Sequence, residues 1–79
     1  MKTVCGLGVH KSMIRMCILK TNGSKVIQEF STLTVDVESM RDLMKEHGVE
    51  EVGMESTGVY WIPIWRILQG HFDLTQITQ

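Results

Sequence analysis

The stretch that decides the fold, residues 51–68, reads EVGMESTGVYWIPIWRIL. It begins as a short apolar strand and continues, after a polar turn, as a helix rich in aromatic residues. Glu55 stands where the strand ends. Open α/β sheets bind ligands beyond the carboxyl ends of their strands, so Glu55 is a candidate site residue. A structural role has equal weight, with the Glu55 carboxylate accepting backbone N–H groups at the start of the helix.

Pro63 restricts where this helix begins, because proline is tolerated in the first turn of a helix but not in its interior. We therefore expect a turn at residues 55–58, a regular helix from Tyr60 or Trp61, and an end at Gly70. Its tryptophans share one helical face, which predicts packing in the core rather than a platform for nucleic-acid bases.

Five segments have the short apolar pattern of strands: residues 3–9, 13–19, 25–32, 49–54 and 72–78. The second segment is apolar at both odd and even positions, which predicts a central strand with both faces buried. The third has mixed faces, as expected near an edge. Between them, Asn22-Gly23 predicts the positive backbone angles of a tight hairpin turn.

Apolar residues recur at helical spacing after Thr34, including Val37, Met40 and Met44. Thr34 or Asp36 is available as the N-cap, and Gly48 is expected to end this helix. The methionines are more typical of a core than of a binding surface.

The predicted order is therefore strand, strand, strand, helix, strand, helix, strand in one domain over residues 1–79. Hairpins join the first three strands, and a strand between two helices favours parallel crossovers. This order predicts an α/β fold with the mixed sheet of the opening half of a ribonuclease-H-like domain.

Composition limits the function classes. The 79 residues are 43% hydrophobic and 22% charged, and their net charge is −1. These values exclude a disordered tail and a basic nucleic-acid arm, so any nucleic-acid contact has to be local. The sequence has no apolar run long enough for a membrane helix and no signal-peptide pattern, which predicts a cytoplasmic protein.

The two cysteines, Cys5 and Cys17, are expected close to opposite each other in the first hairpin. Reduced core thiols are favoured over a disulfide in an intracellular chain. The cysteines and the histidines His10 and His47 do not have the pattern of a zinc site.

Nucleases and transposases on such a sheet cluster carboxylates around two Mg²⁺ ions, which hold the attacking and leaving oxygens of a phosphodiester. One carboxylate usually comes from the first strand and another from the end of the fourth. Glu55 fits the second position. The first strand offers only Gly8, and residues 1–28 contain no Asp or Glu.

Four further residues are candidates for nucleic-acid contact: Lys11, Ser56, Thr57 and Tyr60. A cationic side chain in a turn and hydroxyl groups near the start of a helix are possible phosphate contacts. The structural alternatives are a solvated hairpin for Lys11 and turn or capping roles for Ser56 and Thr57.

Two motifs carry a resemblance: VCGLGVHKSM at residues 4–13 and GMESTGVYWIPIW at residues 53–65. Together they resemble the amino-terminal, RuvC-like domain of the DEDD transposases of the insertion-sequence one-ten family. The resemblance covers essentially the whole chain, which corresponds to the first part of a much longer transposase.

The resemblance implies Mg²⁺-dependent DNA recombination guided by a structured RNA, with a serine nucleophile in a separate carboxyl-terminal domain. It maps the first catalytic aspartate onto Gly8 and the glutamate onto Glu55, and places the last two aspartates beyond Gln79. The metal site is then incomplete, so we expect this chain to bind no Mg²⁺ and to cleave no DNA.

Two hypotheses follow. The chain is a truncated transposase segment that keeps the fold without the activity, or it is a small self-associating or regulatory module that pairs with itself or with a full-length transposase. The second is motivated by an uncovered terminal strand and sheet face, which predict a homo-oligomer. A small-ligand site at the turn after Glu55 ranks below both.

Overall fold

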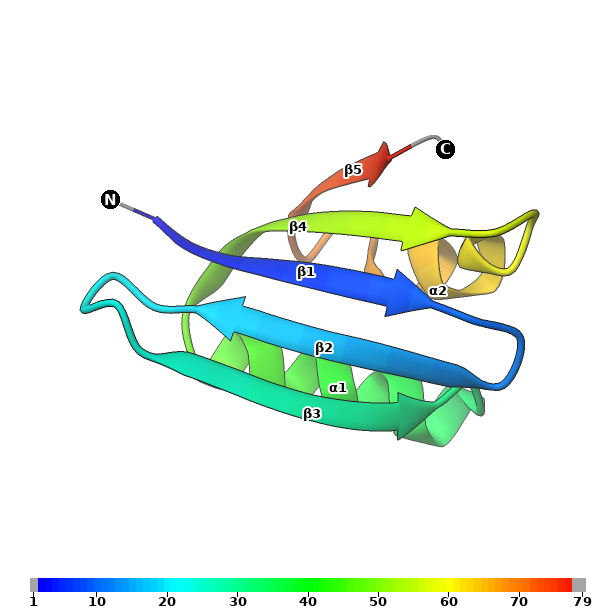
Figure 1. The fold of residues 1–79 in the computed structure, drawn as a ribbon, viewed down its shortest axis with the longest axis horizontal. Helices are drawn as coiled ribbons and strands as arrows, with labels where there is room; N and C mark the ends of the chain where they lie inside the picture. Colours follow the sequence, from blue (N-terminus) through cyan, green and yellow to red (C-terminus); the bar gives the residue numbers. More distant parts are fainter. Residues whose placement is uncertain (1, 78–79) are drawn as a thin grey trace.

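The structure is a computed structural model that describes residues 2–77, and its elements follow the expected order (Figure 1). They are β1 (Thr3–Val9), β2 (Met13–Leu19), β3 (Lys25–Ser31), α1 (Thr34–Glu46), β4 (Val49–Ser56), α2 (Trp61–Leu68) and β5 (Asp73–Ile77).

The five strands form one mixed sheet in the order β3-β2-β1-β4-β5. β1, β2 and β3 pair antiparallel through hairpins, whereas β4 pairs parallel with both β1 and β5. The predicted hairpins, parallel crossovers and edge position of β3 are confirmed. The carboxyl ends of β1 and β4 consequently lie side by side.

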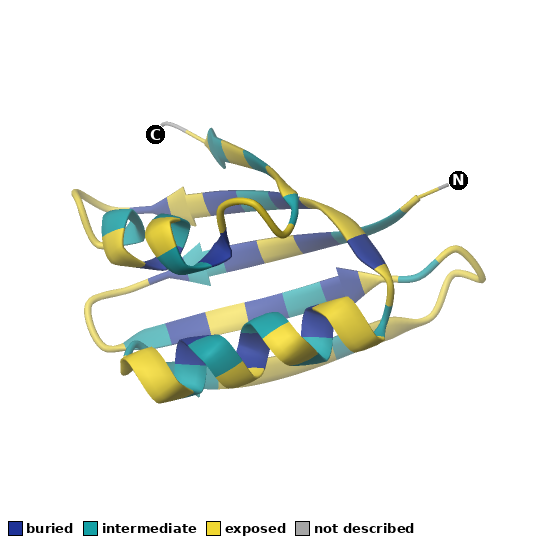
Figure 2. Ribbon diagram, turned by 180° about the vertical axis from the view of Figure 1, so that it is seen from behind, coloured by how far each residue is buried: buried dark blue, intermediate teal, exposed yellow. Residues whose placement is uncertain are grey.

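Both helices cover the same face of the sheet, as Figure 2 shows from behind. Strand alternation divides the residues between this covered face and an open face. The core lies between sheet and helices and consists of Cys5, Leu7, Val9, Ile14, Met16, Ile18, Val37, Met40, Met44, Val49, Val52, Met54, Ile64 and Leu68. The prediction that both faces of β2 are buried was wrong: Ile14, Met16 and Ile18 are buried, but Arg15 and Leu19 are exposed on the uncovered side.

β4 is longer than predicted. It continues to Ser56 because its parallel pairing with β1 extends to Val9 opposite Ser56. The turn is therefore shifted toward the chain's carboxyl end, while α2 begins at Trp61 with Pro63 in its first turn, as expected. The predicted end of the last strand, Thr78, lies outside the described residues.

The N-terminus of α1 differs from both predicted caps. Its N-cap is Leu33, which has no side-chain cap hydrogen bond. Ser31, the last residue of β3, organises this turn instead: its Oγ accepts the Leu33 N–H at 3.1 Å and donates to the Asp36 carboxylate. Gly48 follows the helix with φ +75°, as the predicted stop requires.

The β2–β3 turn is also different from the prediction, because only Gly23 of the Asn22-Gly23 pair has a positive φ. Asn22 uses its side chain, and its Oδ1 accepts hydrogen bonds from the N–H and hydroxyl of Ser24 at 2.9 and 2.7 Å. The connection is thus a longer loop over residues 20–24, closed by the Lys20 N–H donating to the Ser24 carbonyl at 2.9 Å.

Within residues 2–77, no helix has the length and apolar character needed to cross a membrane.

Candidate functional site

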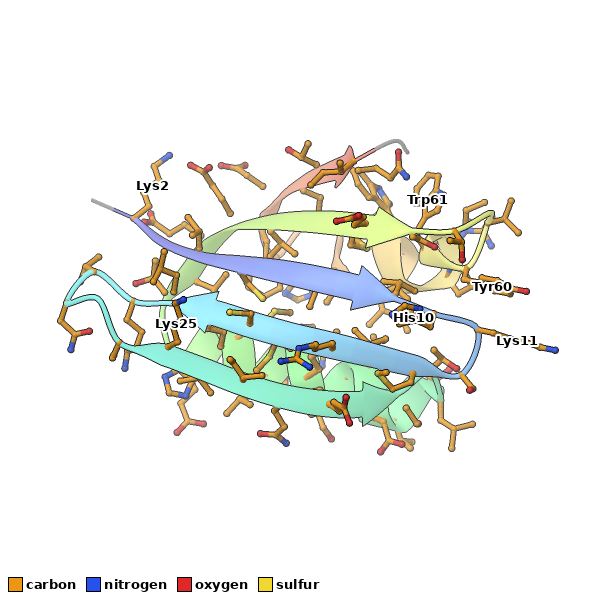
Figure 3. All side chains as sticks on the ribbon, viewed as in Figure 1. Lys2, His10, Lys11, Lys25, Tyr60 and Trp61 are labelled. Atoms are coloured by element: carbon orange, nitrogen blue, oxygen red, sulfur yellow. The ribbon has the colours of Figure 1, made fainter. Side chains whose placement is uncertain are left out.

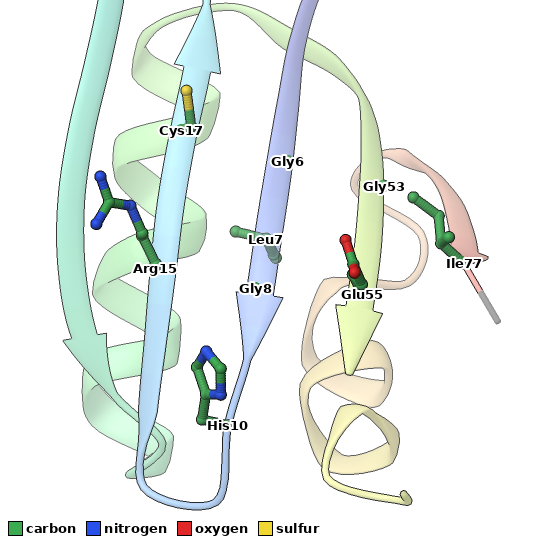
Figure 4. A pocket seen from close by; sticks show the side chains of 9 residues that line it. All are labelled: Gly6, Leu7, Gly8, His10, Arg15, Cys17, Gly53, Glu55 and Ile77. Atoms are coloured by element: carbon green, nitrogen blue, oxygen red, sulfur yellow. The ribbon is translucent and has the colours of Figure 1, made fainter. Parts of the chain in front are cut away.

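The candidate site lies on the open face, where β1 and β4 run parallel. Glu55 is directly opposite Gly8 in the register of the two strands (Figure 4). A shallow hollow of about 310 Å³ surrounds this pair, and its lining residues are Gly6, Leu7, Gly8, His10, Arg15, Cys17, Gly53, Glu55 and Ile77. Glu55 therefore lies beside a hollow whose floor is mostly backbone.

Three glycines make that floor. A Cβ atom built at Gly6 or Gly8 meets no heavy atom within 4 Å, and one at Gly53 lies 3.6 Å from Ile77 Cδ1. No neighbouring side chain needs the space at Gly6 or Gly8. The position opposite Glu55 can consequently hold a longer side chain without displacing the fold.

A second hollow of about 230 Å³ continues from the first, past the ends of β1 and β4. Its lining residues are Gly8, Val9, His10, Glu55, Ser56 and Thr57. Gly8, His10 and Glu55 line both hollows, so they form the connection between them.

Glu55 lies within β4, six positions before α2 begins, and its exposed side chain is on the face opposite the helices (Figure 4). The N-cap position of α2 is occupied by Tyr60, without a side-chain cap. Glu55 is therefore a strand-end residue and is not the N-cap of α2.

Ser56 and Thr57 differ in exposure although they are adjacent. Ser56 is 8% exposed on the covered face, and its Oγ donates to the Thr57 carbonyl at 3.2 Å. Thr57 is exposed beyond the strand. Neither residue caps α2, so the predicted capping role is wrong. Of the two, Thr57 has the more accessible side chain for a ligand.

Lys11 and Tyr60 project past the end of the sheet at which β1 and β4 finish (Figure 3). Lys11 is exposed in the β1–β2 turn, and Tyr60 is 41% exposed. Trp61 and Trp65 instead pack edge to face, with ring centroids 5.6 Å apart, against the core. The tryptophans are partly buried at the margin of the core, so they pack against it, as predicted, without being among its buried residues.

The two cysteines are free thiols on opposite faces of the sheet. Cys17 is opposite Gly6, one register position from Cys5, so the two cysteines lie close to opposite each other, as predicted. Because side chains at successive positions of a strand point to opposite faces of the sheet, this offset of one position places the two thiols on different faces. Burial raises the pKa of the Cys5 thiol to about 12.

Metal ligands do not converge at this site. Among residues 2–77, no group of three or more His, Cys, Asp or Glu side chains could hold a metal ion. At the strand-end position, the neighbours of Glu55 in the register are Gly8 and Ile77, neither of which offers a side-chain ligand. The residues present therefore do not fit a two-metal carboxylate site.

Sequence reasoning missed Arg15 and underrated His10 as lining residues of the site. Arg15 is opposite Gly8 on β2, on the same face as Glu55. The hairpin register between residues 9 and 14 would have identified it, because antiparallel pairing fixes which residue faces Gly8.

Comparison with known proteins adds no family: no protein-family model matches the chain, and a search of curated proteins finds no match.

Proposed function

We propose that this chain is the amino-terminal part of a RuvC-like, ribonuclease-H-like DEDD transposase domain of the insertion-sequence one-ten family, and that it cannot cleave DNA. The support is the two motifs at residues 4–13 and 53–65 together with the order and pairing of the elements. Three antiparallel strands followed by parallel crossovers are what the resemblance implies.

The position of Glu55 carries the proposal. It lies at the carboxyl end of β4, opposite Gly8 of the parallel strand β1 and on the same open face. Carboxylates at these two positions could share a hard cation, since strand neighbours are about 5 Å apart. With glycine in β1, Glu55 has no carboxylate opposite it, and we derive no reaction step through Mg²⁺.

DNA and a guide RNA are the partners that the proposal implies. Lys11, Thr57 and Tyr60 are accessible at the end of the sheet nearest Glu55 and are the candidate contacts. The net charge of −1 supports local contacts rather than a broad basic surface.

The Gly8→Asp variant tests the position. We expect it to bind Mn²⁺, used as a paramagnetic substitute for Mg²⁺, at least about tenfold more tightly than the natural chain, because two carboxylates then face one another. Electron paramagnetic resonance measures the free Mn²⁺. Neither protein should nick supercoiled DNA with Mg²⁺.

Gly6→Asp is the matched control, since it adds the same charge to the same face of β1 but opposite Gly53. Adding Glu55→Gln to Gly8→Asp should remove the gained affinity. Equal Mn²⁺ binding by the Gly8→Asp and Gly6→Asp variants would contradict the assignment of the site, and DNA nicking by the natural chain that Glu55→Gln abolishes would contradict the proposed inactivity.

A further inference from the structure

The strand register arranges the residues of the open face in rows that cross all five strands. Following the strand register from β3 to β5, the first row is Glu29, Arg15, Gly8, Glu55 and Ile77; the second is Ile27, Cys17, Gly6, Gly53 and Thr75; the third is Lys25, Leu19, Val4, Glu51 and Asp73. No described helix or loop covers this face, because α1 and α2 both lie on the other side.

This face combines exposed apolar side chains with a bare centre. Leu19, Ile27 and Ile77 are 42%, 53% and 49% exposed. Between them, Gly6, Gly8 and Gly53 leave the backbone without side chains, and glycine within a strand often marks close approach of another backbone. Leu19 and Ile27 lie on β2 and β3 and Ile77 on β5, so the exposed apolar side chains are on the two sides of this bare centre.

Charge on the open face is divided between its two halves. The β2–β3 half carries Arg15 and Lys25, and the β4–β5 half carries Glu51, Glu55 and Asp73. Glu51 is paired with Lys2 at 2.9 Å, the same lysine interacts electrostatically with Asp73, and Glu29 is opposite Arg15 in the β2–β3 register. With Glu29 counted beside Arg15 and Lys25, the β2–β3 half still has the more positive net charge, and the β4–β5 half, with Glu51, Glu55 and Asp73, the more negative one.

We propose that the open face binds a second copy of this chain, related by a two-fold axis parallel to β1. This rotation places β1 over β1, β2 over β4 and β3 over β5 of the second copy. Arg15 then faces Glu55 of the second copy, and Lys25 faces its Asp73. Symmetry repeats each pair, so the interface contains four complementary contacts.

The charge pattern selects this axis. A two-fold axis across the strands would reverse the order of the rows. It would place Glu29 over Lys25 of the second copy, but it would also place Glu55 over Glu51, with Arg15 over Leu19. Like charges facing one another oppose association. The axis along β1 avoids the Glu55–Glu51 contact and keeps the two β1 strands parallel, within the roughly 30° range of aligned face-to-face packing.

The dimensions fit a small interface. Facing sheets lie about 10 Å apart, a gap that an arginine and a glutamate side chain reach across together. Five strands about 4.8 Å apart, with about seven residues of about 3.3 Å each, give a flat area of about 500 Å² per copy. That is near the lower limit for a specific interface, so the dimer should be weak and depend on concentration. It depends on the open face alone and not on the transposase proposal.

Charge reversal distinguishes this dimer from any other. Sedimentation equilibrium of the 79-residue chain from about 5 to about 500 µM at low salt should show a monomer–dimer equilibrium, weakened by added salt. Arg15→Glu and Glu55→Arg should each raise the dimer Kd at least about tenfold. A one-to-one mixture of the two variants should restore dimerisation, because position 15 of each chain then faces the opposite charge at position 55 of the other.

Glu46→Arg, an exposed change on α1 with the same charge difference as Glu55→Arg, should leave the dimer Kd unchanged. Circular dichroism of each variant confirms that it is folded, and the mixture controls for local damage because it contains only the two impaired chains. The inference is overturned if the natural chain stays monomeric throughout, if either single variant dimerises like the natural chain, or if the mixture dimerises no better than its components.

Discussion

At the scale of single residues, Gly8 decides what Glu55 can do. The two positions are register partners, and the space above Gly8 accepts a side chain. An aspartate there would make a pair of facing carboxylates, whereas glycine leaves bare backbone beside one carboxylate. Because Gly8 has no side chain, it offers no metal ligand, and for the same reason the centre of the open face is flat enough for a second sheet.

Cys5 makes stability depend on pH. Its pKa rises from 9.0 to about 12 in the folded chain because the thiol is buried. The unfolded chain loses this proton first, so the folded state loses stability above about pH 9, by roughly 1.4 kcal/mol per pH unit at most. Below pH 9 both states hold the proton, and the slope vanishes.

Urea unfolding from about pH 8 to about pH 10.5 measures this effect. Cys5→Ala should be less stable at pH 8 because of the lost core volume, but its stability should fall less steeply at high pH. An identical slope in both proteins would show that another group is responsible. Cys17→Ala, which alters the thiol on the open face, is the matched control.

At the scale of elements, the start of α1 depends on a residue outside the helix. Ser31 accepts the Leu33 N–H and donates to Asp36, which joins the end of β3 to the first turn of the helix. Ser31→Ala should therefore lower the free energy of unfolding by about 1 kcal/mol, the usual net contribution of a hydrogen bond.

Ser39 provides the comparison within the same helix. Its exposed hydroxyl donates to the Val35 carbonyl at 3.0 Å. Ser39→Ala should change stability by no more than a few tenths of a kcal/mol, because alanine has the higher helix propensity. If urea unfolding shows equal losses of stability for Ser31→Ala and Ser39→Ala, Ser31 does not stabilise the start of α1 in the way described.

The type and order of all seven elements could be predicted, since apolar periodicity and the punctuation by Gly48, Pro63 and Gly70 are local properties. The α1 cap and the end of β4 could not. The start of α1 depends on Ser31, which belongs to β3, and the end of β4 depends on its pairing with Val9 of β1. Glu55 was predicted as a site residue because it stands at the end of a strand. Arg15 could be identified only from the pairing register of the β1–β2 hairpin.

At the scale of the whole molecule, two helices cover one face of a five-stranded sheet. The apolar residues on both faces of β2 made that strand look fully buried, because sequence pattern does not reveal how many faces have a covering layer. Layer architecture is a property of the whole fold. The open face therefore became visible only in the structure, and with it the rows of charge.

Substitutions at Ile18 and Ile27 compare the covered face of the sheet with its open face. The two residues lie on adjacent strands but on opposite faces, with 0% and 53% exposure. In dilute protein, Ile18→Val should lower the free energy of unfolding by about 1 kcal/mol because it leaves a void in the core. Ile27→Val should change it by less than about 0.5 kcal/mol, as an exposed site does.

The effects of Ile18→Val and Ile27→Val on stability should also differ in how they depend on protein concentration. If the open face binds a second copy, the cost of Ile27→Val should grow as protein concentration rises, because dimerisation stabilises the folded state by mass action. The cost of Ile18→Val should stay constant. Urea unfolding of both variants at two concentrations, on either side of the dimer Kd, measures the difference. A constant, small effect at Ile27 would show that the face stays exposed to water, whereas a large effect even in dilute protein would show that it is covered within the single chain.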